Sequence, residues 1–202
     1  HRHPFCMALV DLDFFKQIND SFGHAVGDAA LRDLAAALRR HTREGDILAR
    51  FGGEEFVLAL PNTDLEGARV LAERIRTYVR GLHWEAEGIS FGLTVSIGLS
   101  TLDHDGRYQG RPLVDHLLRQ ADKALYYCKS NGRDQVSAHE DIPERQRAVA
   151  DLVADGAFGG AGGDQMNLAG ITRREQFDNT DADRGPRGAA DADNNARGIH
   201  GL

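Results

Sequence analysis

This chain of 202 residues has only two cysteines, no long apolar segment and no excess of positive charge. The two cysteines, Cys6 and Cys128, lie in separate apolar patterns, which predicts two reduced, buried thiols rather than a disulfide or a metal site. No apolar run approaches the roughly 18 residues that a membrane-spanning helix needs, and no signal peptide opens the chain. We therefore expect a cytoplasmic protein that makes no membrane contact.

The negative charge of the chain is unevenly distributed. The formal net charge is -7, and the residues from Glu140 onward contribute 12 acidic side chains against 7 arginines, so residues 1–139 are close to neutral. A nucleic-acid-binding face needs clustered Lys and Arg. This composition argues against nucleic acid as a partner, and it is compatible with a small anionic ligand held by a few placed basic groups.

Apolar periodicity predicts alternating strands and helices over the first 139 residues. Strands are expected at residues 5–10, 46–51, 56–60 and 91–99, with a short edge strand at 135–137. Helices are expected at residues 28–42, between a capping box at 63–66 and Gly81, and at 115–130. Gly52 and Gly53 are expected to supply the positive φ angles of a tight hairpin turn. The order predicts an α+β fold, a ferredoxin-like βαββαβ sheet with a central antiparallel hairpin.

The pattern fails after Glu140. Residues 143–153 could form a short helix, but the remainder carries 10 of the 23 glycines and only two aromatic residues. Such a segment cannot bury enough surface to offset its ordering entropy. We predict a folded domain over residues 1–139 and an acidic, Gly-rich tail over residues 140–202, disordered from residue 156.

Four carboxylates flank the predicted strand ends. Asp11 and Asp13 follow the first strand, and Glu54 and Glu55 follow the glycine pair. Because the first and third strands are neighbours in a ferredoxin-like sheet, Asp11 and one of the glutamates should meet at one end of it. Hard oxygen ligands of this kind suit Mg²⁺. An isolated DxD is usually a solvated loop and an isolated GGEE a hairpin tip, so only their combination predicts a metal site.

Four segments in this order resemble the successive motifs of GGDEF-domain diguanylate cyclases. They are DLDFFKQINDSFGHAVGD at residues 11–28, RFGGEEF at 50–56, VSIG at 95–98 and ADKALYYCKSNGRD at 121–134. The resemblance covers residues 5–137. It implies the palm-like sheet of nucleotide cyclases and polymerases, and an enzyme that condenses two GTP into cyclic di-GMP and two pyrophosphates.

The resemblance also implies a two-metal site. Asp11, Glu54 and the Leu12 carbonyl would bind two Mg²⁺ ions, or Mn²⁺ in their place, with Glu55 in support. One metal would lower the pKa of the attacking 3′-hydroxyl, and the other would neutralise charge on the phosphates. Since each domain would hold one GTP, catalysis would require a homodimer.

The remaining motif residues match substrate-binding positions of the family. The resemblance assigns the triphosphate to Lys16, Lys129 and Arg133, the guanine edge to Asn19 and Asp28, and the α-phosphate region to Gly52 and Gly53. A carboxylate accepts from the N1–H and N2–H₂ groups of guanine, whereas adenine has no donor at N1, so GTP should be preferred over ATP. We expect His24 to pack and form hydrogen bonds rather than act as a ligand or base.

An RxxD sequence, Arg43 to Asp46, precedes GGEEF at the position of the family's product-inhibition site. Elsewhere an RxxD would be a charged helix end. At this offset we favour a cyclic di-GMP site, with Arg74 supplying a second guanidinium, because planar forks suit phosphate and the guanine Hoogsteen edge.

One departure from the family concerns the start of the chain. Members usually have a helix and a DxLTGLxNR segment before the first strand, whereas here the strand follows His1 after a few residues. We therefore expect a fragment of a longer signalling protein. Two alternatives remain: an inactive GGDEF-like module that senses GTP or cyclic di-GMP, and a cyclase that makes a mononucleotide product. The intact metal residues oppose the first, and RxxD with the Asn19/Asp28 pair opposes the second.

Overall fold

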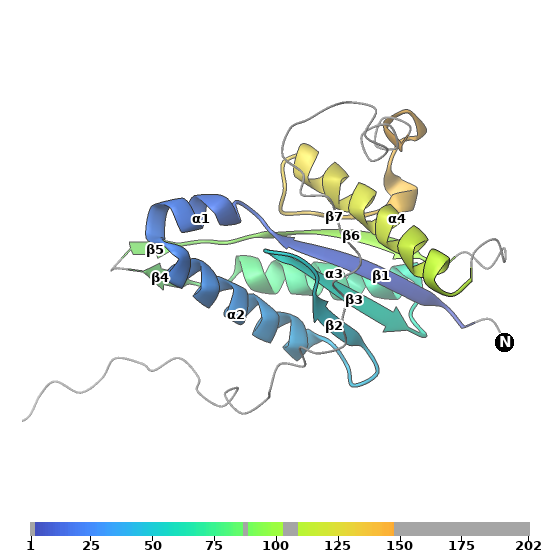
Figure 1. Ribbon diagram of the computed structural model, residues 1–202, viewed down its shortest axis with the longest axis horizontal. Helices are drawn as coiled ribbons and strands as arrows, with labels where there is room; N and C mark the ends of the chain where they lie inside the picture. The colour runs from blue at the N-terminus through green and yellow to red at the C-terminus, as the bar shows by residue number, and fades with distance from the viewer. Residues whose placement is uncertain (1–2, 87–88, 103–108, 148–202) are drawn as a thin grey trace, which may run out of the picture.

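The computed structural model describes residues 3–86, 89–102 and 109–147 (Figure 1). Its helices are α1 (Phe15–Phe22), α2 (His24–His41), α3 (Leu65–Arg80), α4 (Arg111–Ser130) and the short 3₁₀ helix η1 (His139–Asp141). Its strands are β1 (Phe5–Leu12), β2 (Ile47–Arg50), β3 (Glu55–Pro61), β4 (Trp84–Ala86), β5 (Ile89–Phe91), β6 (Val95–Thr101) and β7 (Val136–Ala138).

Five strands form one sheet in the order β2-β3-β1-β6-β7. The first four pair antiparallel in the ferredoxin-like order, and β7 adds a parallel edge strand beside β6. Helices α2 and α3 cover one face of the sheet and α4 covers the other (Figure 1). The predicted fold class is therefore confirmed, including the expected adjacency of the first and third strands.

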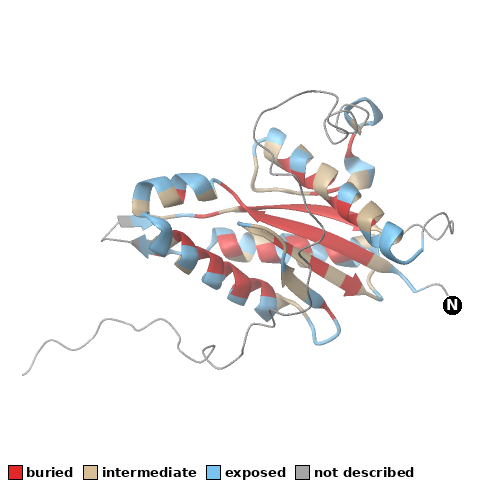
Figure 2. Ribbon diagram, in the orientation of Figure 1, coloured by how far each residue is buried: buried red, intermediate tan, exposed pale blue. Residues whose placement is uncertain are grey.

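Strand β1 is buried on both faces because it lies in the middle of the sheet. Its alternate residues Cys6 and Ala8 join the core beneath α2 and α3, whereas Met7 and Leu9 pack with α4. Figure 2 shows burial concentrated in the central strands and on the inward faces of the helices. Cys6 and Cys128 are both free and buried, as predicted, and burial raises the pKa of each thiol to about 12.

Gly98 explains how closely α4 lies on β6. A Cβ atom at this position would collide with the backbone of the helix, at the carbonyl oxygen of Ala121 and the amide nitrogen of Leu125. Only a residue without a side chain permits this approach. The approach fixes the height of α4 above the sheet, and with it the position of Lys129 in the last turn of the helix.

Several element boundaries differ from the sequence predictions. Helix α1 was not predicted, and α2 begins at His24 rather than at residue 28, because a break at Gly23 (φ 81°) separates the eight-residue α1 from the longer α2. The ribbon of β4 and β5 was also missed, and the strand expected at 91–99 is divided between β5 and β6. Helix α4 begins at Arg111, and the cap of α3 is Asp64, whose side chain accepts from the Gly67 amide at 2.9 Å.

Residues 140–147 pack against the sheet domain. Ile142 is 2% exposed, and both guanidinium nitrogens of Arg69 on α3 donate to Asp141 at 2.7 and 2.6 Å. The predicted boundary after residue 139 thus falls inside a packed segment. Of the helix predicted at 143–153, residues 144–147 are helical. The rest of that helix and the tail predicted to be disordered lie outside the described residues. No helix within the described ranges is long and apolar enough to cross a membrane.

Candidate active site

The predicted carboxylates meet at one end of the sheet. Asp11 on β1 lies directly opposite Glu55 on β3, and the Leu12 amide donates to the Glu54 carbonyl at 3.4 Å. Asp11 is only 3% exposed, and Lys129 from α4 places its Nζ 2.8 Å from the Asp11 Oδ2. Strands β1 and β3 and helix α4 therefore place Asp11, Glu55 and Lys129 close together. The sequence predicted this meeting for the two carboxylates.

The electrostatics of this cluster favour added positive charge. Burial raises the pKa of Asp11 to about 7; the nearby Lys129 opposes the shift, and Glu54 and Glu55 increase it. Burial likewise raises the pKa of Glu55 and of Asp122 on α4, again against the effect of Lys129. One lysine thus compensates several partly desolvated carboxyl groups incompletely. Asp122 is a member of this cluster that the sequence prediction missed.

The donor set fits a magnesium ion that shares its coordination with a ligand. Within the described residues, no group of three or more His, Cys, Asp or Glu side chains is arranged to hold a metal by itself. Mg²⁺ is, however, commonly held by one or two carboxylates together with substrate phosphates and water. Asp11 and Glu54 offer hard oxygen ligands of that kind, and Leu12, whose amide donates to the Glu54 carbonyl, follows Asp11 at the end of β1.

Asp13, the second acid of the DxD sequence, has a different environment. It is 1% exposed and accepts hydrogen bonds from Thr94 Oγ1 at 2.7 Å, Ser96 Oγ at 2.8 Å and the Asp134 amide at 3.1 Å. A carboxylate with three internal donors is already satisfied. Asp13 therefore joins β1, the approach to β6 and the loop after α4.

The glycine turn differs from the predicted tight turn. The Phe51 amide donates to the Glu55 carbonyl at 2.7 Å, leaving three residues in the loop, and neither Gly52 nor Gly53 has a positive φ. Their small size matters instead: a Cβ at Gly52 would lie 2.8 Å from Glu55 Oε2, and the space above Gly53 is open. Arg50, which the prediction missed, donates to both glycine carbonyls at 2.6–3.2 Å and holds the turn in shape.

A cavity of about 260 Å³ lies between α2 and the β2–β3 hairpin. Its lining is Asp28, Leu31, Arg32, Arg50 and Phe56. Asp28, the predicted guanine reader, is thus exposed at the edge of a concave space beside the glycine turn.

The side chain of Asn19, the second predicted base reader, packs against Gly27, the residue that precedes Asp28. A Cβ at Gly27 would collide with Asn19 Oδ1, so the glycine makes room for this side chain. The Oδ1 atom is buried and accepts no hydrogen bond within the described part of the chain. His24, expected to pack, is instead exposed at the first residue of α2.

Two predicted phosphate-binding residues lie near the start of α1. Lys16 is exposed in the first turn of that helix. Arg133 follows α4, and its guanidinium carbon lies 4.6 Å from the centre of the Phe14 ring, which is half exposed. Lys129, the third predicted phosphate-binding residue, lies at the carboxylate cluster itself, 2.8 Å from Asp11.

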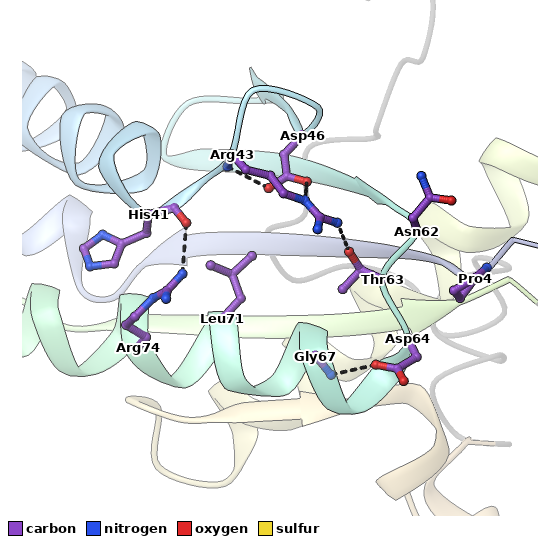
Figure 3. Close-up of a pocket in the computed structure, with 10 residues that line it drawn as sticks. All are labelled: Pro4, His41, Arg43, Asp46, Asn62, Thr63, Asp64, Gly67, Leu71 and Arg74. Carbon is purple, nitrogen blue, oxygen red and sulfur yellow. Dashed lines mark hydrogen bonds and ion pairs between the residues drawn. The ribbon is translucent and has the colours of Figure 1, made fainter.

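The three predicted product-binding residues line a second cavity, of about 390 Å³, at the opposite end of the β2–β3 hairpin (Figure 3). The Arg43 amide and Nε donate to Asp46 at 2.9 and 3.1 Å, and its Nη2 donates to the Pro61 carbonyl at 2.7 Å and to Thr63. Arg74 Nη2 donates to the His41 carbonyl at 3.1 Å. RxxD is therefore more than a solvated helix end, because it ties the start of β2 to the end of β3.

Comparison with known proteins identifies the family that carries this sheet and these motifs. Residues 1–135 match the family model described as diguanylate cyclase, GGDEF domain. The chain belongs to the GGDEF-domain family, as the sequence motifs indicated.

The similarity extends to curated relatives and to solved structures. Diguanylate cyclase A of Treponema denticola is 41% identical over 136 residues, which is 67% of this chain. The active GGEEF domain of a diguanylate cyclase from Vibrio cholerae is 33% identical, with a TM-score of 0.63 over 70% of this chain and 86% of that one. The GGDEF domain of DgcB from Caulobacter crescentus, solved in complex with c-di-GMP, is 31% identical, with a TM-score of 0.62 over 68% and 79%.

These curated relatives are considerably longer than the matched region. The chain covers 35% of the Treponema denticola protein and 18% of DgcP, a diguanylate cyclase of Pseudomonas aeruginosa to which it is 40% identical over 130 residues.

Proposed function

We propose that this domain condenses two GTP molecules into cyclic di-GMP with release of two pyrophosphates. The single observation that carries the proposal is the under-compensated cluster of buried Asp11 with half-buried Glu54 and Glu55, at the same end of the sheet as a cavity edged by Asp28. The first feature suits Mg²⁺ with bound phosphates, and the second suits a base with hydrogen-bond donors.

The residues of the metal site have distinct tasks in this reaction. Asp11, Glu54 and the Leu12 carbonyl would hold two Mg²⁺ ions, with Mn²⁺ as a substitute, and Glu55 would support them. When bound, the metals would activate the 3′-hydroxyl of one GTP and neutralise charge on the phosphates of the other. Lys129 lies 2.8 Å from Asp11, so its ammonium group is already directed at the place where phosphate charge would develop.

The substrate is recognised at both of its ends. Asp28 would accept from the N1–H and N2–H₂ groups of guanine, and the buried, unpaired Oδ1 of Asn19 offers a further acceptor. Lys16, Lys129 and Arg133 would balance the triphosphate charge, and Gly52 and Gly53 leave room for the α-phosphate because the space above Gly53 is open.

Catalysis needs two copies of the chain in this scheme. One domain presents one carboxylate cluster and one base cavity, so it can position one GTP, whereas two reacting GTP molecules must face each other. We therefore infer a homodimer, formed at least during turnover.

The second cavity supports a regulatory role. Arg43, Asp46 and Arg74 line it together, and the side chain of Arg43 is 58% exposed and so accessible to a ligand. Guanidinium groups there would bind the phosphates and guanine edges of cyclic di-GMP, which would inhibit the enzyme from a distance.

The direct test is to incubate the protein with GTP and Mg²⁺ and identify the products by mass. Cyclic di-GMP and pyrophosphate are expected, at an initial rate that rises with the square of protein concentration while dimers are scarce. A Glu54→Gln preparation serves as the control for contaminating enzymes. Binding of GTP without any product would contradict the cyclase proposal and favour a sensory module.

A further inference from the structure

Backbone strain is concentrated beside the triphosphate-binding residues. In the described part of the chain, four non-glycine residues have positive φ, and three of them, Phe14 (60°), Arg133 (62°) and Asp134 (48°), lie around one loop. Left-handed geometry strains a non-glycine residue, and it persists only where the surrounding structure holds the residue in place. The contacts that hold these residues are therefore informative about the loop.

Asp134 is fixed from two directions. Its amide donates to Asp13 Oδ2 at 3.1 Å, below the end of β1. From the other side Arg76 on α3 donates through Nη1 to both the Asp134 carbonyl (3.2 Å) and its Oδ1 (2.7 Å), and Arg80 lies 3.1 Å from Oδ2. The side chains of Arg76 and Asp134 are 19% and 22% exposed, so solvent screens this pair less than an open surface pair.

Asp13 is fixed in turn by two hydroxyl groups. Thr94, just before β6, donates to one carboxylate oxygen of Asp13 at 2.7 Å, and Ser96, within β6, donates to the other at 2.8 Å. A hydrogen-bonded path therefore runs from the sheet through Asp13 to the Asp134 backbone and on to α3. Its middle residue, Asp134, is the immediate neighbour of Arg133.

The guanidinium of Arg133 has its own support. It lies over the Phe14 ring with 4.6 Å from Cζ to the ring centre, and Phe14 is held in left-handed geometry directly after Asp13. A cation–π contact of this kind attracts the guanidinium to the ring face and orients the planar group. Arg133 is thus fixed at its backbone through Asp134 and at its side chain through Phe14, and both supports lead back to Asp13.

We propose that Asp13, Asp134 and Arg76 act as positioning residues that preorganise Arg133 to receive the phosphates of the nucleotide. The inference rests on the proposed triphosphate role of Arg133 and extends it to three residues that need not touch the substrate. The physical gain is entropic: an arginine already held in place loses little further freedom when phosphate binds. The ion pair between Arg76 on α3 and Asp134 then holds the loop in its strained conformation.

Helix α3 offers a matched control for the test. Arg69, two turns before Arg76 on the same helix, also pairs with an aspartate of the C-terminal segment, Asp141, at 2.6 Å, and the Arg69 side chain is 29% exposed. Among the described residues, no hydrogen bond or ion pair links Arg69 or Asp141 to Asp13 or Asp134. Arg69→Met removes the ion pair with Asp141, and Arg76→Met removes the pair with Asp134 together with a pair to Glu73 (2.8 Å) within α3; both variants keep the apolar stem.

The measurement compares ligands that contain phosphate with ligands that do not. In Arg76→Met, inhibition by inorganic tripolyphosphate should weaken and the KM for GTP should rise, each about 10-fold, by analogy with the loss of a partner that orients a ligand-binding group. The affinity for guanosine should stay unchanged. Arg69→Met should leave all three values at those of the wild type. A uniform loss for every ligand, or an equal loss in Arg69→Met, would overturn the proposal.

A double-mutant cycle separates this inference from the function it rests on. Arg133→Ala should weaken tripolyphosphate binding, and adding Arg76→Met to it should cost nothing more, because Arg76 acts through Arg133. The same additional loss in both backgrounds would refute the positioning role. If Arg133→Ala itself has no effect, the triphosphate assignment fails instead.

Asp134→Asn provides a second probe in case Arg76→Met does not fold. It retains the amide that donates to Asp13 and the volume of the side chain, and it removes the charge that faces Arg76 and Arg80. It should show the same selective loss of tripolyphosphate binding. A folded Asp134→Asn protein with unchanged tripolyphosphate inhibition would overturn the proposal.

Discussion

Replacing Asp11 by asparagine should stabilise the metal-free protein at alkaline pH, although it removes a residue of the catalytic site. The pKa of Asp11 is raised from 3.8 to about 7, chiefly by burial, so the folded state binds a proton more tightly than the unfolded state. Between about pH 4 and pH 7 the native protein then carries more protons than the unfolded chain, and its free energy of unfolding falls as pH rises through this range.

The magnitude follows from the size of the shift. A pKa raised from 3.8 to about 7 corresponds to at most ~4 kcal/mol of unfolding free energy at 1.36 kcal/mol per unit. This stability is lost by about pH 7, and the loss stays constant above that pH. Asp11→Asn cannot ionise and should escape this loss; Lys129, whose side chain is 32% exposed, would remain solvated. At pH 8 in EDTA, the variant should therefore unfold at higher denaturant concentration than the wild type.

Magnesium should stabilise only one of the two proteins appreciably. It competes with the proton for Asp11, so it should stabilise the wild type more at pH 8 than at pH 5, and it should do little for Asp11→Asn. Asp33→Asn is a suitable control, because Asp33 on α2 also has a pKa raised by burial but is not one of the site carboxylates. Urea titrations at the two pH values decide the matter. An Asp11→Asn protein less stable than the wild type at pH 8 would refute the reasoning.

Three further substitutions test the remaining assignments. Glu54→Gln keeps the shape of the turn but removes a ligand charge, so cyclic di-GMP synthesis should be abolished with an unchanged circular dichroism spectrum; near-normal synthesis would exclude the metal role. Asp28→Ser cannot accept from both guanine donors, and with equimolar GTP and ATP it should yield adenine-containing products, whereas a purely guanine product would argue against base reading by Asp28. Arg43→Ala should remove a charge-assisted contact with the product of ~1.5–3 kcal/mol, which weakens product inhibition roughly 10- to 100-fold. Initial turnover should survive because the second cavity lies at the far end of the hairpin. Equal product sensitivity of the variant and the wild type in progress curves would refute the product site.

The sequence was sufficient to predict the framework of the site. A continuous apolar run before Asp11 predicts a strand buried on both faces, and such a strand belongs in the middle of the sheet. Once that strand neighbours the one after Gly52-Gly53, the meeting of Asp11 with the glutamate pair follows from the register. These features depend on side-chain polarity along the chain, which local pattern conveys well.

Features that depend on tertiary contacts could not be predicted in this way. Phe14 adopts a left-handed conformation that aromatic residues normally avoid, and the reason lies in contacts that a local pattern does not contain. Helix α1 has only eight residues, too few for a clear helical period. The proximity of Lys129 to Asp11 requires α4 to lie directly on β6, and this in turn depends on a missing side chain at Gly98.

The two aspartates of the DxD sequence show why spacing alone is a poor guide to role. They are two residues apart and almost equally buried, at 3% and 1% exposure. Asp13 accepts three hydrogen bonds from within the protein, so its negative charge is already accommodated. Asp11 has one ammonium partner and two nearby glutamates, so burial leaves its charge under-compensated. A cation relieves the second situation but not the first. The metal binding proposed for Asp11 and the rigid support at Asp13 therefore rest on what surrounds each carboxylate, and the shared end of β1 couples the two roles.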